Sequence, residues 1–164
     1  MKTLILMRHG KSDWSEGGEP DFERPLAPRG IKAAKQAGRL LDRAGLRPDR
    51  VLTSAAERAR HTAEIAYAAG GFAGPIEIRP ELYETSPPAA LEVIRRHGLE
   101  ASVLLVVGHE PTSSALIGLL VGGGRHEMVT AALAGIEIDI DSWDELGAGR
   151  GTLTFLAPPR LLEG

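Results

Sequence analysis

Short apolar runs alternate with helical stretches along most of this chain, and few folds accommodate that order. Strands are predicted at residues 3–8, 50–53, 76–79, 103–108, 135–141 and 152–157. Helices are predicted at residues 28–44, 56–69, 88–96 and 112–121. Helices between strands supply the crossovers that parallel pairing requires. The sequence therefore predicts a single α/β domain over residues 1–164, with three layers: a mostly parallel open sheet of about six strands and helices on both of its faces.

The segment 136–141 differs from the other apolar runs because isoleucine and acidic residues alternate strictly in it. Strict alternation is typical of a strand with one buried and one exposed face, whereas strands buried on both faces are continuously apolar. We therefore expect this one strand to lie near an edge of the sheet and to be antiparallel.

Composition excludes several classes of function. The chain has no cysteine, which excludes disulfides, thiolate catalysis and cysteine-based metal sites. Its formal net charge of −3 argues against nucleic-acid binding, which requires a clustered basic excess. The apolar residues before Arg8 are too few for a signal peptide or a membrane span. We expect a cytoplasmic protein that binds neither nucleic acid nor a membrane and uses no metal or other cofactor.

Two histidines follow apolar strands in similar surroundings. His9 follows the first run, between Arg8 and Gly10, and His109 follows the fourth run, just before a predicted helix. Parallel strands present their carboxyl ends at one edge of the sheet, which is where open α/β folds bind ligands. We expect both imidazoles at that edge, with Gly10 allowing the backbone to approach a ligand closely.

Arg58 is predicted in the first turn of the helix that follows the strand ending at Thr53. A cation at that position opposes the helix macrodipole, which indicates that an anion shares the site. Arg60 projects in another direction and is expected on a solvated helix face. Two arginines and two histidines at one sheet edge suit a dianionic phosphoryl group, because guanidinium groups bind its oxygens bidentately and an imidazole can attack phosphorus.

These residues, in this order, resemble the histidine phosphatase superfamily, which has the phosphoglycerate-mutase-like fold. The resemblance is carried by Arg8-His9-Gly10, by the strand end and helix that bring Arg58, and by Gly108-His109. Within the superfamily the chain is similar to the short phosphohistidine phosphatase branch. That similarity lies in Lys11-Ser12 followed by Trp14, in residues 21–26 with Gly30, in Leu82-Tyr83-Glu84 and in residues 139–143.

The resemblance implies a covalent phosphohistidine intermediate with His9 as the nucleophile. Arg8, Arg58 and His109 would then bind the phosphoryl group and stabilise the transition state, with His109 acting mainly as a cation. Glu84 is the candidate general acid, and Glu81 is the alternative.

One departure from the branch is Glu110, which follows His109 and must turn its carboxylate away from a bound phosphate. A second departure has no expected consequence: the branch often has alanine where Gly10 stands, a harmless exchange of small residues.

The expected substrate is phosphohistidine in a protein. No insertion between Arg58 and His109 is long enough to close over the pocket, and an open site admits a side chain on a protein surface. Three other functions remain: a broad phosphomonoesterase acting on small phosphate esters, a phosphate-binding module without turnover, and a metal site built from His9, His109 and Glu84. Two arginines in the pocket would repel a metal cation, which argues against the last.

Overall fold

A computed structural model describes residues 1–14 and 20–162, and in this part of the chain six strands form one sheet in the order β3-β2-β4-β1-β5-β6. The strands are β1 (Lys2–Arg8), β2 (Arg50–Thr53), β3 (Ile76–Ile78), β4 (Val103–Gly108), β5 (Leu133–Ile138) and β6 (Gly151–Ala157). The helices are α1 (Pro28–Arg43), α2 (Glu57–Gly70), α3 (Pro87–His97) and α4 (Thr112–Val121). The predicted α/β class and mostly parallel sheet are confirmed.

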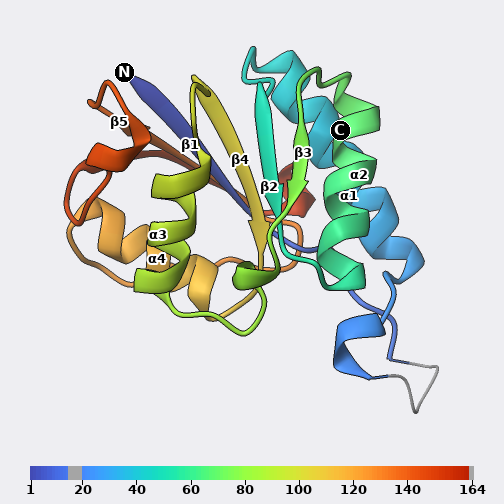
Figure 1. The fold of residues 1–164 in the computed structure, drawn as a ribbon. Coiled ribbons are helices and arrows are strands. Elements are labelled where there is room, and N and C mark those ends of the chain that lie inside the picture. Colours follow the sequence, from blue (N-terminus) through green and yellow to red (C-terminus); the bar gives the residue numbers. More distant parts are fainter. Residues whose placement is uncertain (15–19, 163–164) are drawn as a thin grey trace.

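Helices cover both faces of the sheet, which completes the three predicted layers (Figure 1). On one face α3 and α4 pack against alternate strand residues that include Leu4, Leu52 and Leu104. On the other face α1 and α2 pack against the intervening residues, among them Ile5 and Leu105. Residues 4–7 and 104–108 are buried throughout, which explains why these runs are continuously apolar.

Strand β5 is the one strand of the described sheet that runs against the others. It pairs antiparallel with β1 on one side and with β6 on the other, whereas β1, β2, β3 and β4 pair in parallel. The predicted antiparallel strand near an edge is therefore confirmed: it is β5, which lies next to the edge strand β6. Its bounds differ from the prediction, because pairing with β1 begins at Leu133 and the chain turns after Ile138, where the amide of Ile140 donates to the Ile138 carbonyl.

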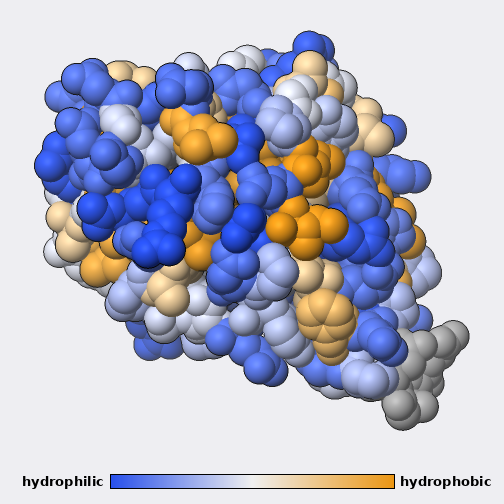
Figure 2. Space-filling model, in the orientation of Figure 1, coloured by the Kyte–Doolittle hydropathy of each residue, from blue (hydrophilic) through white to orange (hydrophobic). Residues whose placement is uncertain are grey.

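Four short 3-10 turns, at Asp21–Glu23, Pro80–Leu82, Trp143–Glu145 and Pro159–Leu162, join these elements and were not predicted from the sequence. The first two lie near the carboxyl ends of the strands and bring polar side chains to that edge. The outer surface of the molecule on the side of α3 and α4 is largely hydrophilic, with apolar residues in small groups (Figure 2). No helix in the described ranges is long and apolar enough to cross a membrane.

Candidate active site

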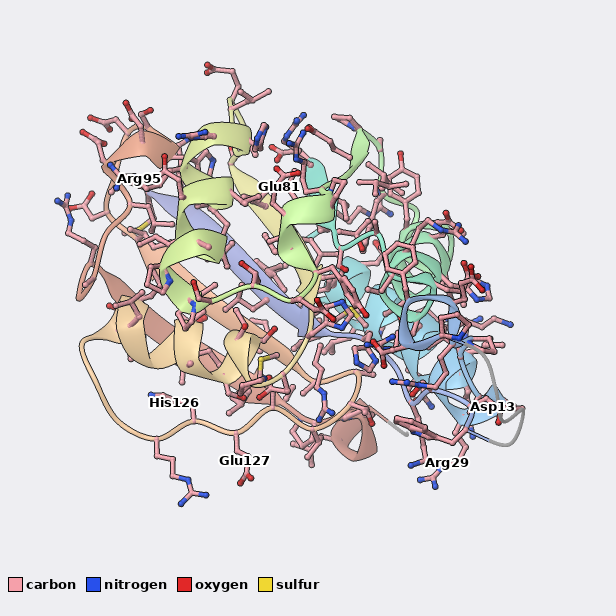
Figure 3. The ribbon with its side chains drawn as sticks, turned by 60° about the horizontal axis from the view of Figure 1, so that its bottom comes forward. Asp13, Arg29, Glu81, Arg95, His126 and Glu127 are labelled. Atoms are coloured by element: carbon pink, nitrogen blue, oxygen red, sulfur yellow. The ribbon has the colours of Figure 1, made fainter. Side chains whose placement is uncertain are left out.

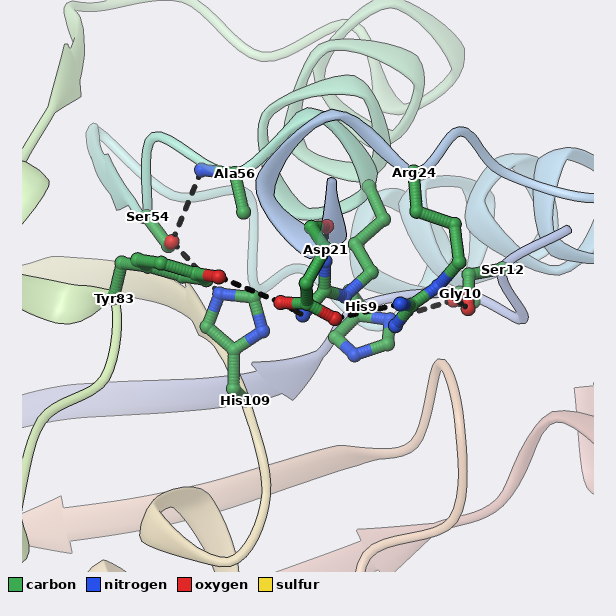
Figure 4. Close-up of polar contacts among 10 residues, drawn as sticks. His9, Gly10, Ser12, Asp21, Arg24, Ser54, Ala56, Tyr83 and His109 are labelled. Carbon is green, nitrogen blue, oxygen red and sulfur yellow. Dashed lines mark hydrogen bonds and ion pairs between the residues drawn. The ribbon is translucent and has the colours of Figure 1, made fainter. Parts of the chain in front are cut away.

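His9 and His109 lie side by side at the carboxyl edge of the sheet, as predicted. Strands β1 and β4 are parallel neighbours in which Arg8 pairs with Gly108, so the residue after each strand arrives at the same place. The centroids of the two imidazole rings are 5.2 Å apart, and the ring planes are tilted by 54°, so the rings lie next to each other in Figure 4. Topology thus assembles a pair of histidines separated by about a hundred residues of sequence.

The surroundings of His9 hold its imidazole neutral and fix its tautomer. Nδ1 lies 2.7 Å from the carbonyl oxygen of Gly10, which can only accept, so Nδ1 carries the proton and Nε2 carries the lone pair. Only 7% of the residue is exposed. Burial lowers its pKa to about 4, against the hydrogen bond to Gly10 and with the help of the charges on Arg58 and Arg8. His9 can therefore act as a nucleophile at neutral pH.

The surroundings of His109 also hold its imidazole neutral. Its Nε2 is hydrogen-bonded to the Ser54 hydroxyl at 2.7 Å, while its buried Nδ1 has no partner and lies on the side of the ring toward His9 (Figure 4). Burial, followed by His9 and Arg58, lowers its pKa to about 3. Two arginines and a second imidazole disfavour another positive charge at this place, so a cationic His109 that faces a bound phosphoryl group stays a prediction.

Arg8 and Arg58 reach the two histidines from different elements. Arg8 ends β1 and donates from Nη1 to the Met128 carbonyl, while Arg58 is the second residue of α2, as predicted, and is 6% exposed. The Nε atoms of both guanidinium groups are buried without a partner. Together with Nδ1 of His109, they are the three buried side-chain nitrogens that lack a partner among the described residues. All three belong to this site, where an oxyanion would satisfy them.

A hollow of about 300 Å³ lies above the two imidazoles. Its walls carry the two arginines and two histidines together with Lys11, Ser12, Trp14, Arg24, Glu110 and Thr130. The guanidinium group of Arg24 stacks on the Trp14 ring at 3.6 Å and donates to the Ser12 hydroxyl. The lining is therefore rich in cations, and a phosphoryl group bound there would meet charge-assisted donors.

Asp21 links three site residues and was not predicted to have a role. Its carboxylate accepts from the Tyr83 hydroxyl at 2.6 Å, from Arg24 at 2.6 Å and from Arg58 at 3.0 Å, and its carbonyl accepts from Nη1 of Arg58 (Figure 4). The bonds from Tyr83, Arg24 and Arg58 hold the pKa of Asp21 far below its usual range. The same carboxylate raises the pKa of Tyr83 to about 12, and the Tyr83 ring packs edge-on against His109.

Four residues of the site were not predicted from the sequence, and the signals that could have indicated them differ. Ser54 directly follows β2, so the rule that located the histidines at strand ends could have found it. Tyr83 and Arg24 fall within stretches that carry the family resemblance. Asp21 begins the same stretch as Arg24, but the sequence did not show that a short turn would bring it to the site from outside the sheet.

The two glutamates considered as general acids lie outside the hollow. Glu84 is exposed, with a left-handed backbone (φ 51°), and Glu81 is paired with Arg79 (Figure 3). Glu110 lines the hollow, but its carboxylate accepts from the amide of Ser114 and so caps α4, as its predicted turn away from phosphate requires. In the described ranges no cluster of three histidine or acidic side chains could hold a metal. The alternative metal site with Glu84 is therefore not assembled.

The structure explains the glycine at position 10 by packing within the protein, whereas the sequence predicted a close approach to a ligand. A Cβ at Gly10 would lie 2.8 Å from the carbonyl oxygen of Gly30, so the start of α1 packs directly on the loop after β1. The Gly10 amide donates to Thr62, and its carbonyl positions the His9 ring. The expectation that alanine replaces Gly10 without harm is therefore wrong here, because the extra methyl meets backbone that must shift.

Arg60, two residues after Arg58, has the surface position that its spacing predicts. It forms ion pairs with Glu57 and Glu64 on the exposed side of α2. These pairs leave Arg58 as the arginine of α2 that enters the site.

Comparison with known proteins identifies similar chains. Residues 4–89 match the histidine phosphatase superfamily (branch 1). An uncharacterized protein of Mycobacterium tuberculosis (strain ATCC 25618 / H37Rv) is 48% identical over 111 residues, which cover 67% of this chain and 66% of that protein, just under two thirds of its length. An uncharacterized protein of Mycobacterium leprae is 36% identical over 73% of this chain and 74% of its own length.

Two solved structures share the fold over nearly the whole chain. One is described as a putative phosphohistidine phosphatase SixA from Nakamurella multipartitia, with a TM-score of 0.81, 30% identity and coverage of 96% of both chains. The other is the protein histidine phosphatase SixA complexed with tungstate, with a TM-score of 0.81, 25% identity and coverage of 98% of this chain and 99% of that one.

Proposed function

Because this chain belongs to the histidine phosphatase superfamily (branch 1), we propose that it hydrolyses phosphohistidine in a protein through a covalent phosphohistidine intermediate on His9. The observation that carries the proposal is the set of three buried nitrogens without partners: Nε of Arg8, Nε of Arg58 and Nδ1 of His109. Leaving a buried donor unpaired costs free energy. A tetrahedral oxyanion above His9 would satisfy all three.

In the first step, the lone pair on Nε2 of His9 attacks phosphorus and the bond from phosphorus to the leaving nitrogen breaks. Negative charge spreads over the three equatorial oxygens, where Arg8 and Arg58 donate to it. The bound dianion also raises the pKa of the neighbouring His109, which favours its protonated form. The leaving imidazole carries away the electron pair of the broken bond and takes a proton from solvent.

In the second step, water attacks the phosphorus of phosphorylated His9. The bond between phosphorus and Nε2 breaks, its electron pair returns to the imidazole, and the proton lost by water leaves with inorganic phosphate or solvent. Donation from Nδ1 to Gly10 keeps the ring oriented through both steps.

The substrate class is inferred from the poor supply of a general acid. Glu84 is exposed outside the hollow, the Glu110 carboxylate caps α4, and Asp21 is ionised. An alkoxide leaving group needs a proton as its bond to phosphorus breaks, whereas imidazole is a much weaker base and needs less help. A phosphohistidine substrate suits this site, and two similar structures bear phosphohistidine or protein histidine phosphatase names.

The test compares purified protein on three substrates: a phosphohistidine peptide, the same peptide with phosphoserine, and a sugar phosphate. We expect kcat/KM to be highest for the phosphohistidine peptide, and His9→Ala to eliminate both turnover and the phosphoenzyme. Higher kcat/KM for the esters would favour a broad phosphomonoesterase. Binding of phosphate without turnover of any substrate would refute the enzymatic proposal.

A broad phosphomonoesterase keeps one supporting observation. A 2,3-bisphosphoglycerate-dependent phosphoglycerate mutase of Thermobifida fusca is 48% identical over 76 residues, which cover 44% of this chain and 30% of that enzyme. The matching segment covers too little of the mutase for the mutase's substrate to be assigned to this chain. Hydrolysis of small phosphate esters is therefore kept as the second candidate function, which the same experiment tests.

A further inference from the structure

The exposed face of α1 carries a row of five cations, which we call the basic stripe: Arg29, Lys32, Lys35, Arg39 and Arg43. Their spacings of three, three, four and four residues place them on one face of a helix. The opposite face, which includes Ala34, Ala37 and Leu41, is buried. The stripe extends about 21 Å at the α-helical rise per residue.

The cations of the basic stripe are not balanced by acids. In the ranges that the structure describes, none of the five forms an ion pair, whereas Arg60 on α2 and Arg96 on α3 both do. Asp42, the one acidic residue of α1, is paired with Arg47. Like charges three and four residues apart destabilise a helix. Arg29 also lies in the first turn of α1, where the macrodipole favours acids.

The basic stripe begins beside the candidate active site. Gly30, next to Arg29, packs against Gly10, and a groove of about 550 Å³ lies between α1 and the chain around Val129 and Leu156. Lys11 and Thr130 line both the groove and the hollow above the histidines, so the two are contiguous. In Figure 3 Arg29 projects outward at the start of α1.

The groove combines cationic and apolar walls. Lys11, Arg29 and Lys32 supply the cations, and among the described residues Glu127 is the one carboxylate in its lining. Val129 is 50% exposed, and prolines and a leucine of the C-terminal segment form the opposite wall. A chain that crossed from the stripe into the hollow would therefore meet positive charge along its path and apolar side chains at its centre.

We propose that the basic stripe and this groove dock an acidic segment of the phosphorylated protein substrate, next to its phosphohistidine. The proposal rests on the proposed function for its substrate. A peptide with several acidic side chains matches a row of cations of this length, and aliphatic side chains match the apolar wall. A nucleic acid fits less well, since no aromatic residue lines the groove on which bases could stack, and the chain has a net charge of −3.

The first test measures turnover of two phosphohistidine peptides that differ in their flanks, one with four glutamates and one with four glutamines. Wild-type protein should show the higher kcat/KM for the acidic peptide, through a lower KM, and the preference should shrink as ionic strength rises. Lys35→Gln/Arg39→Gln should reduce the preference by roughly five- to tenfold. The matched control, Arg95→Gln/Arg96→Gln, removes two cations from α3 on the other face of the sheet and should keep the preference (Figure 3).

The second test is independent of catalysis. Fluorescence anisotropy compares binding of an unphosphorylated, dye-labelled acidic peptide to wild type and to both variants. Binding that is lost in the stripe variant and kept in the control supports docking, even if no phosphohistidine peptide is hydrolysed, and in that case the proposed function alone fails. Equal binding in all three proteins would overturn the docking proposal. So would tighter binding of a single-stranded RNA or of phosphatidylserine vesicles.

Discussion

Arg58→Ala is the substitution that most directly tests the site, because this guanidinium group is nearly enclosed. Its side chain is 7% exposed, Nη1 and Nη2 donate to Asp21, and Nε is buried without a partner among the described residues. A phosphoryl group at His9 would find one donor of Arg58 free and already oriented. Alanine removes that donor and leaves the charge of the substrate facing a site with one cation fewer.

The magnitude follows from the burial of Arg58. Loss of one partner of a desolvated, hydrogen-bonded charge pair costs about 3–5 kcal/mol. Each ~1.36 kcal/mol is a tenfold change in rate, so kcat/KM should fall between roughly a hundredfold and a few thousandfold. Arg58→Lys should restore little, because an ammonium group cannot donate to Asp21 and to phosphate in the fixed directions of a guanidinium group.

The assay is kcat/KM on a phosphohistidine peptide, with a urea unfolding curve for each variant. Arg60→Ala is the matched control, since Arg60 lies on the same helix and its partners are Glu57, which is half-buried, and Glu64, which is exposed. It should change kcat/KM less than twofold, as expected of a surface pair. A folded Arg58→Ala protein with near-normal activity would refute the assignment of Arg58 to the phosphoryl group.

Five further predictions concern the histidines and the carboxylates. His9→Ala should abolish labelling by a ³²P-phosphohistidine peptide, whereas persistent label on a histidine would transfer the nucleophile's role to His109. The pKa of His9 is lowered to about 4 in the folded protein, so kcat/KM should persist into mildly acidic solution and fall only as the pH approaches 4, and a pH-rate profile that falls near the ordinary histidine pKa would contradict this. Since the unfolded chain binds protons at His9 and His109 that the folded chain does not, the free energy of unfolding measured in urea should fall as the pH drops below about 6.5, and this slope should weaken in His9→Gln. Glu84→Gln should leave phosphohistidine turnover within about twofold of wild type, and a large loss in a folded variant would make Glu84 the general acid. The lowered pKa of Asp21 means that its stabilisation is present at neutral pH and is lost as acid protonates it, so Asp21→Asn should lower the urea midpoint at pH 7 more than at pH 3.

Much of the architecture could be predicted from the sequence because the relevant signals are local. Strands β2 and β4 and helix α4 have the predicted bounds, since each apolar run and each Gly or Pro boundary acts within a few residues. The strict alternation after Ile136 correctly indicated the one antiparallel strand. The arrival of His9 and His109 at one edge was equally predictable, because parallel strands place their carboxyl ends at the same edge. Their contact also requires β1 and β4 to be neighbours, and the sequence did not show that strand order.

Other features depend on where distant segments meet. The sequence could not show that Asp21 would bind Arg58, Arg24 and Tyr83. These hydrogen bonds join residues up to 62 positions apart in the chain, which meet near the carboxyl edge of the sheet. The neutral form of His109 that the folded site favours could not be predicted for the same reason. Its pKa is lowered by burial and by neighbouring cations that only the folded chain brings together.

The sequence by itself thus determined the α/β fold, the strand ends that carry both histidines, and the placement of Arg58 at the start of a helix. The tertiary structure decided which acids remain outside the site, which donors are left unpaired, and that the cations of α1 start beside the hollow. The physical reason is the distance along the chain over which each interaction acts. Backbone periodicity and turn chemistry act between neighbours in the chain, whereas desolvation and ion pairing depend on contacts that exist only after folding.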